Sequence, residues 1–125
     1  MTETNPGRLS GVSDIFLQPL RIDANHPAFA GHFPGRPIVP GVVLLDQVLI
    51  AIAPWLATLP GASSIPPHCE IVNTKFLSAV APGELLQLQA TRQAGEEEET
   101  IRFDLVGTTR KVASGIIKIH RQATP

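Results

Sequence analysis

Residues 25–49, NHPAFAGHFPGRPIVPGVVLLDQVL, join a loop dense in proline and glycine to a long apolar run. Each proline fixes φ and removes a donor, and each glycine permits left-handed or closely approached backbone. A loop with so little backbone freedom can hold one imidazole, that of His32, in a fixed place.

The apolar run is expected to form a helix with Pro40 in its first turn, where the N–H that proline lacks would have no partner. Apolar side chains occupy every side of this helix, which predicts that other elements wrap it completely. Those side chains are Val42, Val43, Leu44, Leu45, Val48, Leu49, Ile50 and Ile52. The helix is expected to end near Ala53 or to continue irregularly past Pro54.

Asp46 and Gln47 are the only polar side chains of this run before Pro54. An ionised carboxylate in apolar surroundings is costly unless it is paired or faces a cavity, so we expect Asp46 to face a cavity. Five residues separate it from Gly41, which is about 7–8 Å along a helix axis. Asp46 is therefore expected near the loop that carries His32.

The segment GHFPGRPIVPGV at residues 31–42, followed by an acid at Asp46, closely resembles the active-site segment of the β-hydroxyacyl-acyl-carrier-protein dehydratases of the FabZ and FabA type. This resemblance implies a hotdog fold, an α+β architecture in which an antiparallel sheet wraps a long central helix. The FabZ branch usually has Glu at the acid and the FabA branch has Asp, so Asp46 in a FabZ-like setting leaves the branch open. Small dehydratase-like proteins of aryl-polyene and related pigment pathways are also similar.

The resemblance implies a dehydratase that removes water from β-hydroxyacyl thioesters, in fatty-acid, polyketide or aryl-polyene-type synthesis. His32 would be the base for the α-proton, and Asp46 would orient or protonate the departing hydroxyl. The backbone N–H of Gly41 would approach the thioester carbonyl, as a helix N-terminus is suited to do. The carbonyl of Ile38 would hold the His32 ring and fix its tautomer.

Three further positions are expected to contact substrate. Gly31, like Gly41, would permit close approach of backbone to the substrate. Phe33 and Leu45 would line the acyl site, although apolar residues belong to a core more often than to a pocket.

The same resemblance implies an acyl carrier protein as partner, with the substrate on its phosphopantetheine arm and no other cofactor. It also implies a homodimer or higher homo-oligomer in which His32 of one subunit meets Asp46 of the other. Four basic residues could dock the acidic carrier: Arg21, Arg36, Lys75 and Arg110. No Cys/His cluster has zinc-ligand spacing, so no metal site is predicted.

Composition excludes several other classes. A chain of 125 residues with 43% hydrophobic and 17% charged residues is expected to fold as one globular domain. The net charge of -1 gives no electrostatic footprint for nucleic acid or an anionic membrane. A single cysteine, no apolar leader and no run of membrane-spanning length favour the cytoplasm.

In the rest of the chain, apolar and polar residues alternate with the period of two that is typical of strands. Residues 1–12 read as a lead-in, 13–121 as a single domain and 122–125 as a tail. Strands are expected within residues 15–22, 68–76, 84–92, 100–106 and 111–120. Cys69 is expected to be a small core residue, His26, His68 and His120 to be structural or exposed, and residues 96–99 to form a solvated hairpin tip.

Two other function classes stay open. The hotdog scaffold also supports thioester hydrolysis with an acid on the same helix, so a thioesterase is the first alternative. A non-catalytic assembly subunit is the second, although the presence of both His32 and Asp46 argues against it.

Overall fold

The computed structural model describes residues 14–23, 38–62, 67–95 and 98–121. It contains, in chain order, β1 (Ile15–Arg21), α1 (Gly41–Leu56), β2 (His68–Phe76), β3 (Leu85–Ala94), β4 (Glu99–Val106) and β5 (Lys111–His120). The predicted α+β order of one strand, one helix and four strands is confirmed. The helix continues through Pro54 to Leu56, the second of the two endings considered above.

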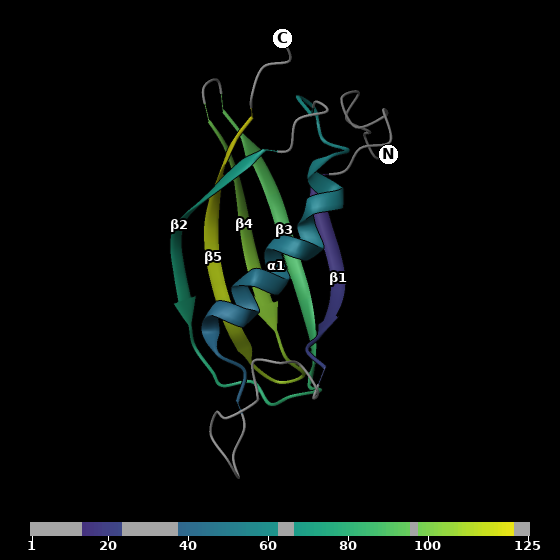
Figure 1. The fold of residues 1–125 in the computed structure, drawn as a ribbon, viewed down its shortest axis with the longest axis vertical. Coiled ribbons are helices and arrows are strands. Elements are labelled where there is room, and N and C mark those ends of the chain that lie inside the picture. The colour runs from purple at the N-terminus through teal and green to yellow at the C-terminus, as the bar shows by residue number, and fades with distance from the viewer. Residues whose placement is uncertain (1–13, 24–37, 63–66, 96–97, 122–125) are drawn as a thin grey trace, which may run out of the picture.

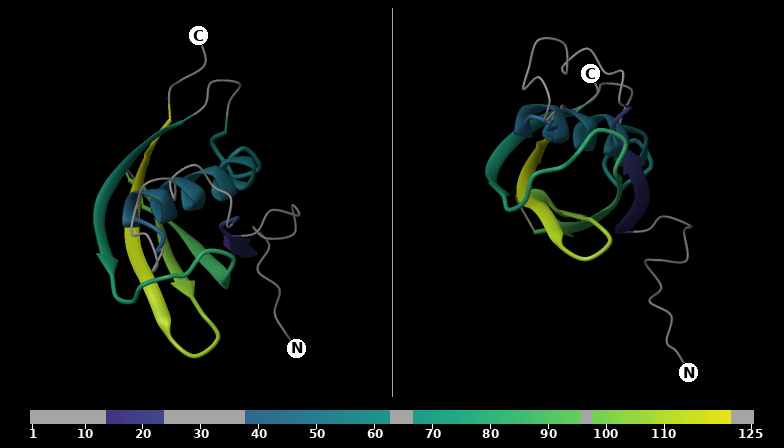
Figure 2. Two further views of the ribbon diagram at one scale, coloured as in Figure 1. Left: turned by 60° about the horizontal axis from the view of Figure 1, so that its bottom comes forward. Right: turned by 90° about the horizontal axis from the view of Figure 1, so that it is seen from below.

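The strands form one antiparallel sheet in the order β1-β3-β4-β5-β2. Figure 1 shows this sheet behind α1, which crosses the strands diagonally. Figure 2 shows that the sheet curls around the helix, so that β1 and β2 approach its two sides. The two edge strands of the sheet therefore flank the helix.

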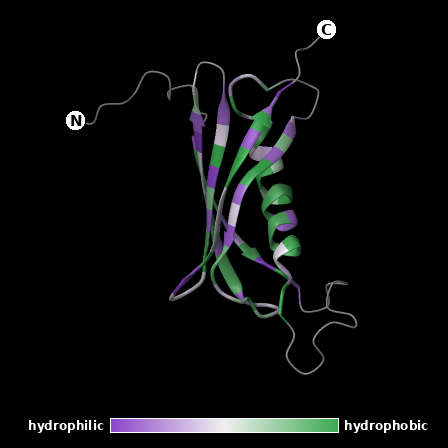
Figure 3. Cartoon of the chain, turned by 90° about the vertical axis from the view of Figure 1, so that its left-hand side faces the viewer, coloured by the Kyte–Doolittle hydropathy of each residue, from purple (hydrophilic) through white to green (hydrophobic). Residues whose placement is uncertain are grey.

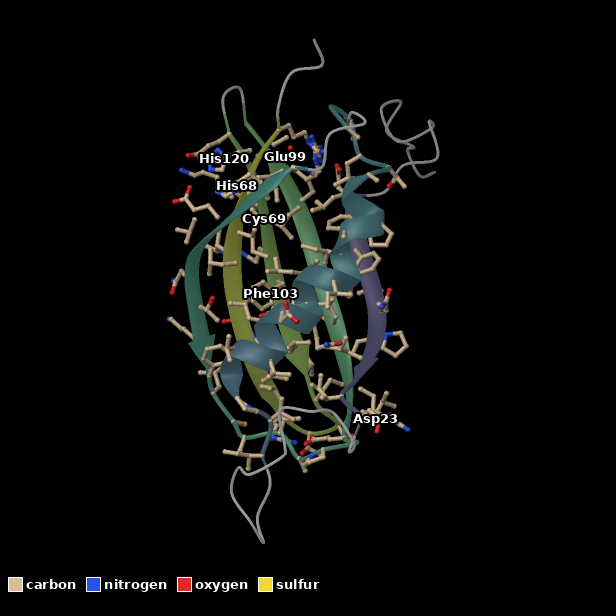
Figure 4. The ribbon with its side chains drawn as sticks, viewed as in Figure 1. Asp23, His68, Cys69, Glu99, Phe103 and His120 are labelled. Carbon is tan, nitrogen blue, oxygen red and sulfur yellow. The ribbon has the colours of Figure 1, made fainter. Side chains whose placement is uncertain are left out.

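The core lies between the concave face of the sheet and one side of α1. Alternate side chains of β3 are buried, namely Leu86, Leu88 and Ala90, as their period of two predicts. Phe103 of β4 is among the largest fully buried side chains, and Figure 4 shows it at the middle of the sheet, behind the helix. Its ring lies against Gly115 of β5, where a Cβ would come within 2.6 Å of the ring. Gly115 is thus needed to seat Phe103.

The C-terminal half of α1 is fastened to the edge strand β1 by an aromatic pair. The rings of Phe16 and Trp55 are stacked, with their centroids 5.2 Å apart and their planes 18° apart. Offset aromatic pairs at such separations add to the stabilisation that area burial provides. This pair fixes where the end of the helix lies on the sheet.

The expectation that other elements wrap α1 completely is wrong within one chain. Val42 is 72% exposed and Ile50 is 59% exposed, whereas Val48 and Ile52 are fully buried. The physical reason is that a single curled sheet covers only one side of a helix. Figure 3 shows that α1 is coloured hydrophobic over most of its length, including the side away from the sheet.

Within the described ranges, no helix combines the length and the apolar character that crossing a bilayer requires.

Candidate functional site

The exposed side of α1 carries a carboxylate between two apolar neighbours. Val42, Asp46 and Ile50 follow one another at intervals of four, which places them on one face of the helix. Asp46 is exposed, so the described residues of the chain do not enclose it in the cavity that was expected. The sequence places this acid correctly on the helix, but the apolar surface around it is the outside of the chain and not its core.

The N-terminus of α1 lies next to this face, since Val42 is in its first turn. Pro40 is the N-cap and has no side-chain cap hydrogen bond, and the first turn contains no acidic residue. The N–H groups of Val43 and Leu44 donate to the carbonyl of Pro40 at 3.0 and 3.2 Å. The segment before the helix is fixed by the N–H of Val39, which donates to the carbonyl of Val80 at 2.8 Å.

Gly41, the first residue of α1, lies under the ring of Phe76 at the end of β2. A Cβ at Gly41 would lie 3.0–3.1 Å from three carbon atoms of that ring, closer than ordinary contacts. Glycine is therefore needed at this position to accommodate the chain's own Phe76. Sequence reasoning did not single out Phe76, because nothing in a strand pattern says which helix turn its last residue will touch.

Phe76 is 50% exposed although it is a large aromatic residue. It forms one wall of a hollow of about 340 Å³ at the start of the helix. The other lining residues are Ile38, Val39, Gly41, Leu44, Leu77, Ser78 and Ala79. Two of the predicted substrate-contacting positions, Ile38 and Gly41, are thus brought together in one hollow.

The other predicted site residues divide into two groups. Leu45 is half-buried and packs against the core, so its side chain belongs at least partly to the fold. His32, Gly31 and Phe33 lie outside the described residues.

A larger hollow, of about 540 Å³, lies along the second half of α1. One wall consists of Leu49, Ile50, Ala53, Pro54 and Leu56 from the helix and of its C-cap Ala57, and the rest consists of Ala62, Pro67, Cys69 and Arg121. Arg121 is the one charged residue in this lining. We call this hollow the helix groove; its size is within the range of small-molecule sites.

Arg121 is held in place at the groove by Glu99. Its Nε donates to Glu99 Oε1 at 2.7 Å, and its Nη2 donates to Glu99 Oε2 at 3.0 Å and to the Leu56 carbonyl at 3.3 Å. Arg92 Nε donates to the same carboxylate at 2.7 Å, and Arg92 also pairs with Asp14 at 3.3 Å. Figure 4 shows Glu99 and Cys69 toward the same end of the sheet.

The prediction that residues 96–99 form a solvated tip is therefore wrong for Glu99, whose side chain is 13% exposed. Burial alone would raise the pKa of Glu99, but hydrogen bonds from Arg121 and Arg92 lower that pKa below its ordinary value. Burial raises the pKa of the Cys69 thiol, and the Arg121 guanidinium offsets only part of this increase. Cys69 packs beside the core as expected and is not an activated nucleophile.

The described histidines lie away from the exposed helix face. His68 and His120 are exposed cross-strand partners on β2 and β5, with ring centroids 5.9 Å apart, and Figure 4 shows them at the same end of the sheet. A hydrogen bond between Glu70 and His120 Nε2 lowers the pKa of Glu70. Within the ranges that the structure covers, no group of three His, Cys, Asp or Glu side chains is arranged to hold a metal ion.

The candidate carrier-docking cations do not share one strand. Arg21 is on β1 and Lys75 is on β2, the opposite edges of the sheet. Arg110 is engaged by Glu84 at 2.7 Å and by the Ala79 carbonyl. Arg36 lies outside the described residues.

Comparison with known proteins identifies the family. The family model described as ApeI-like, the ApeI dehydratase, matches residues 13–116. The chain belongs to the ApeI-like dehydratase family. A solved structure of the dehydratase heterocomplex ApeI:P from Xenorhabdus doucetiae is 29% identical, with a TM-score of 0.62 over 88% of this chain and 90% of that one. The predicted resemblance and the predicted hotdog fold are thus confirmed.

Sequence relatives point in the same direction. A 3-hydroxyacyl-acyl-carrier-protein dehydratase FabZ from Symbiobacterium thermophilum is 36% identical over 69 residues, which is 54% of this chain and 49% of that protein. A FabZ from Rickettsia bellii is 33% identical over 94 residues, covering 73% and 60%. The chain spans about half the length of the first of these curated relatives.

A structure of the fluoroacetyl-CoA thioesterase FlK also matches, with a TM-score of 0.58 over 87% of this chain and 85% of that chain. Its sequence identity is 16%, so this likeness shows the fold alone.

Proposed function

We propose that this chain is a dehydratase that removes water from β-hydroxyacyl thioesters carried on an acyl carrier protein, giving trans-2-enoyl thioesters. The observation that carries the proposal is the exposed Asp46 on an otherwise apolar helix face, in a chain of the ApeI-like dehydratase family. A carboxylate in that position is separated from bulk water once another surface covers the face. Such a carboxylate can act on a substrate held between the two surfaces.

Four groups of the chain are assigned roles in this reaction. His32 takes the α-proton, since an ordinary imidazole has a pKa of about 6.5 and is largely neutral at working pH. Asp46 orients or protonates the departing hydroxyl. The N–H of Gly41, at the positive end of the helix dipole, stabilises charge on the thioester oxygen. The Ile38 carbonyl holds the imidazole by accepting from one ring nitrogen.

The proposed assembly is a homodimer with shared active sites. Strand β2 is a sheet edge, and it presents Ile71, Val72 and Phe76 to solvent. Leu77, the residue that follows the strand, is also exposed. A register shift between Ile71 and Asn73 marks a bulge in this strand. An exposed edge next to an exposed apolar helix face is a surface that proteins normally cover. A second copy placed there would cover Val42 and Ile50 and bring its own His32 to Asp46.

The test is turnover. Purified protein is incubated with a β-hydroxyacyl-carrier thioester and, separately, with its trans-2-enoyl counterpart, and products are followed by mass spectrometry. We expect the wild type to remove water from the first thioester and to add water to the second. The rate of both reactions should fall by about 10²–10⁴-fold in His32→Ala and in Asp46→Asn. His68→Ala and Asp104→Asn are the matched controls, because both residues lie outside the proposed site, and they should retain activity. Release of free acid without interconversion would identify a thioesterase instead.

A mixing experiment tests the shared site. His32→Ala and Asp46→Asn are inactive separately, but a mixed dimer contains one site with both native groups. Random exchange of subunits should therefore restore about a quarter of wild-type activity. Absence of any recovery, while light scattering shows that mixed dimers form, would place both groups in one subunit. Turnover that requires a different second chain would indicate a heteromeric enzyme.

A further inference from the structure

The helix groove continues the face of α1 that carries Asp46. Its helix-side lining begins with Leu49 and Ile50, about one turn beyond Asp46, and ends at Leu56 and Ala57. The lining between these points is apolar. A substrate whose reacting carbons lie at Asp46 therefore has an apolar path along the helix for its acyl chain.

This path ends at a fixed charge pair. The Arg121 side chain is 14% exposed, and its guanidinium is anchored at three points, two on Glu99 and one on the carbonyl of Leu56. An anchored guanidinium cannot swing aside as a free surface arginine would. An alkyl chain that reached it would have to displace hydrogen bonds to a charged group without replacing them, which is costly.

The distance from Asp46 to the Arg121 end of the groove sets the length of acyl chain that the groove can hold. Ten residues separate Asp46 from Leu56, which is about 15 Å along the helix. A van der Waals contact with the guanidinium takes up about 4 Å of this length. Extended chains advance roughly 1.2 Å per bond, as in a fully extended backbone, so about nine bonds fit beyond the β-carbon. The groove accommodates acyl groups of about twelve carbons by this measure.

We propose that the Arg121–Glu99 ion pair is the end wall of the acyl-binding groove and limits the substrate to chains of about twelve carbons. The inference rests on the proposed function and adds to it a substrate range and two specificity-determining residues. Neither residue takes part in the chemistry. Glu99 acts only by holding Arg121 in place.

The experiment measures kcat/KM for β-hydroxyacyl thioesters in a series from about six to about sixteen carbons. For the wild type we expect a fall of about tenfold or more beyond twelve carbons, the effect of a methylene group that does not fit. Arg121→Ala should remove the fall, so that the ratio of kcat/KM for long substrates to kcat/KM for short ones rises by about tenfold or more. Glu99 remains paired with Arg92 in this variant, so the end of the sheet keeps its internal ion pair.

Two further variants separate a wall from a merely stabilising pair. Arg92→Ala removes the other partner of Glu99 and does not line the groove, so it should lower the melting temperature while the chain-length limit stays. Ala53→Leu narrows the groove midway, about 10 Å from Asp46, and should lower the limit to about eight carbons.

The outcomes are distinct. Turnover with an unchanged limit in Arg121→Ala would overturn the inference and leave the proposed function standing. No dehydration at any chain length would overturn both. A change in molar mass by light scattering for Ala53→Leu, with no change in the limit, would mean that a second copy occupies the groove, and would also overturn the inference.

Discussion

The two faces of α1 are almost equally apolar, yet only one of them belongs to the core. Leu44, Val48 and Ile52 are buried against the sheet, whereas Val42 and Ile50 are largely exposed with Asp46 between them. The buried face holds the chain together. The exposed face has the same kind of side chains, but they form a surface that a second protein surface can cover.

This difference shows how a small domain can provide an apolar site without a large interior. A single curled sheet buries one side of its central helix and leaves the other for a second surface to enclose. The acid lies on the side left open, and a change there is expected to affect function more than folding.

The largest expected effect comes from two isoleucines two positions apart. Ile52→Ala should lower the free energy of unfolding by about 2–5 kcal/mol, because it leaves a cavity in a packed core. Ile50→Ala, the matched control, should change the unfolding of the separated chain by less than about 0.5 kcal/mol and instead weaken self-association. Urea titration and analytical ultracentrifugation measure the two effects. Equal losses of unfolding free energy would contradict the distinction between the faces.

At the far end of the helix, Glu99 holds Arg121, which donates to the carbonyl of Leu56. Glu99→Gln should lower the free energy of unfolding by about 1–3 kcal/mol, since it weakens charge-assisted hydrogen bonds from Arg92 and Arg121. The lowered pKa of Glu99 means that its contribution is present above its ordinary value of 4.5 and is lost as the pH falls through the lowered value.

Unfolding measured across acidic pH tests this sign. The wild type should lose stability below about pH 4.5 more steeply than Glu99→Gln does. If the unfolding free energies of the two proteins change in parallel with pH, Glu99 is not the source of this pH dependence.

The smallest effect is at the start of the helix. Gly41→Ala should lower the unfolding free energy by about 1 kcal/mol, the cost of overpacking against Phe76 minus the helix preference of alanine. Phe76→Leu in the same chain should relieve the clash, giving a coupling of at least about 0.5 kcal/mol in a double-mutant cycle. If the effects of the two single variants are additive, the Phe76 ring is not the reason why glycine is needed at position 41.

Much of the fold could be predicted from the sequence, because each element has its own period. The alternation in β3 and the continuous apolar run after Pro40 identify a strand and a helix without reference to any partner. The β2 and β5 bounds match the prediction at both ends. The resemblance at residues 31–42 supplied the family, which the comparisons confirm.

The errors have one physical origin. Apolar character does not distinguish a side chain that packs on the sheet from one that stays exposed on the other side of the helix, so the sequence wrongly predicts complete wrapping of α1. The sequence wrongly predicts a solvated Glu99, because its two arginine partners, Arg92 and Arg121, come together with it only through the pairing of β3, β4 and β5. The contact between Gly41 and Phe76 also needs three-dimensional placement.

The stacked pair of Phe16 and Trp55 has a practical consequence. Trp55 is the chain's only tryptophan, so its fluorescence reports on one place, the junction between the helix end and β1. At that junction the helix contacts β1 through its buried side. Emission from the native protein should therefore follow the opening of the core while staying insensitive to ligands on the exposed face, which gives an optical signal for folding alone.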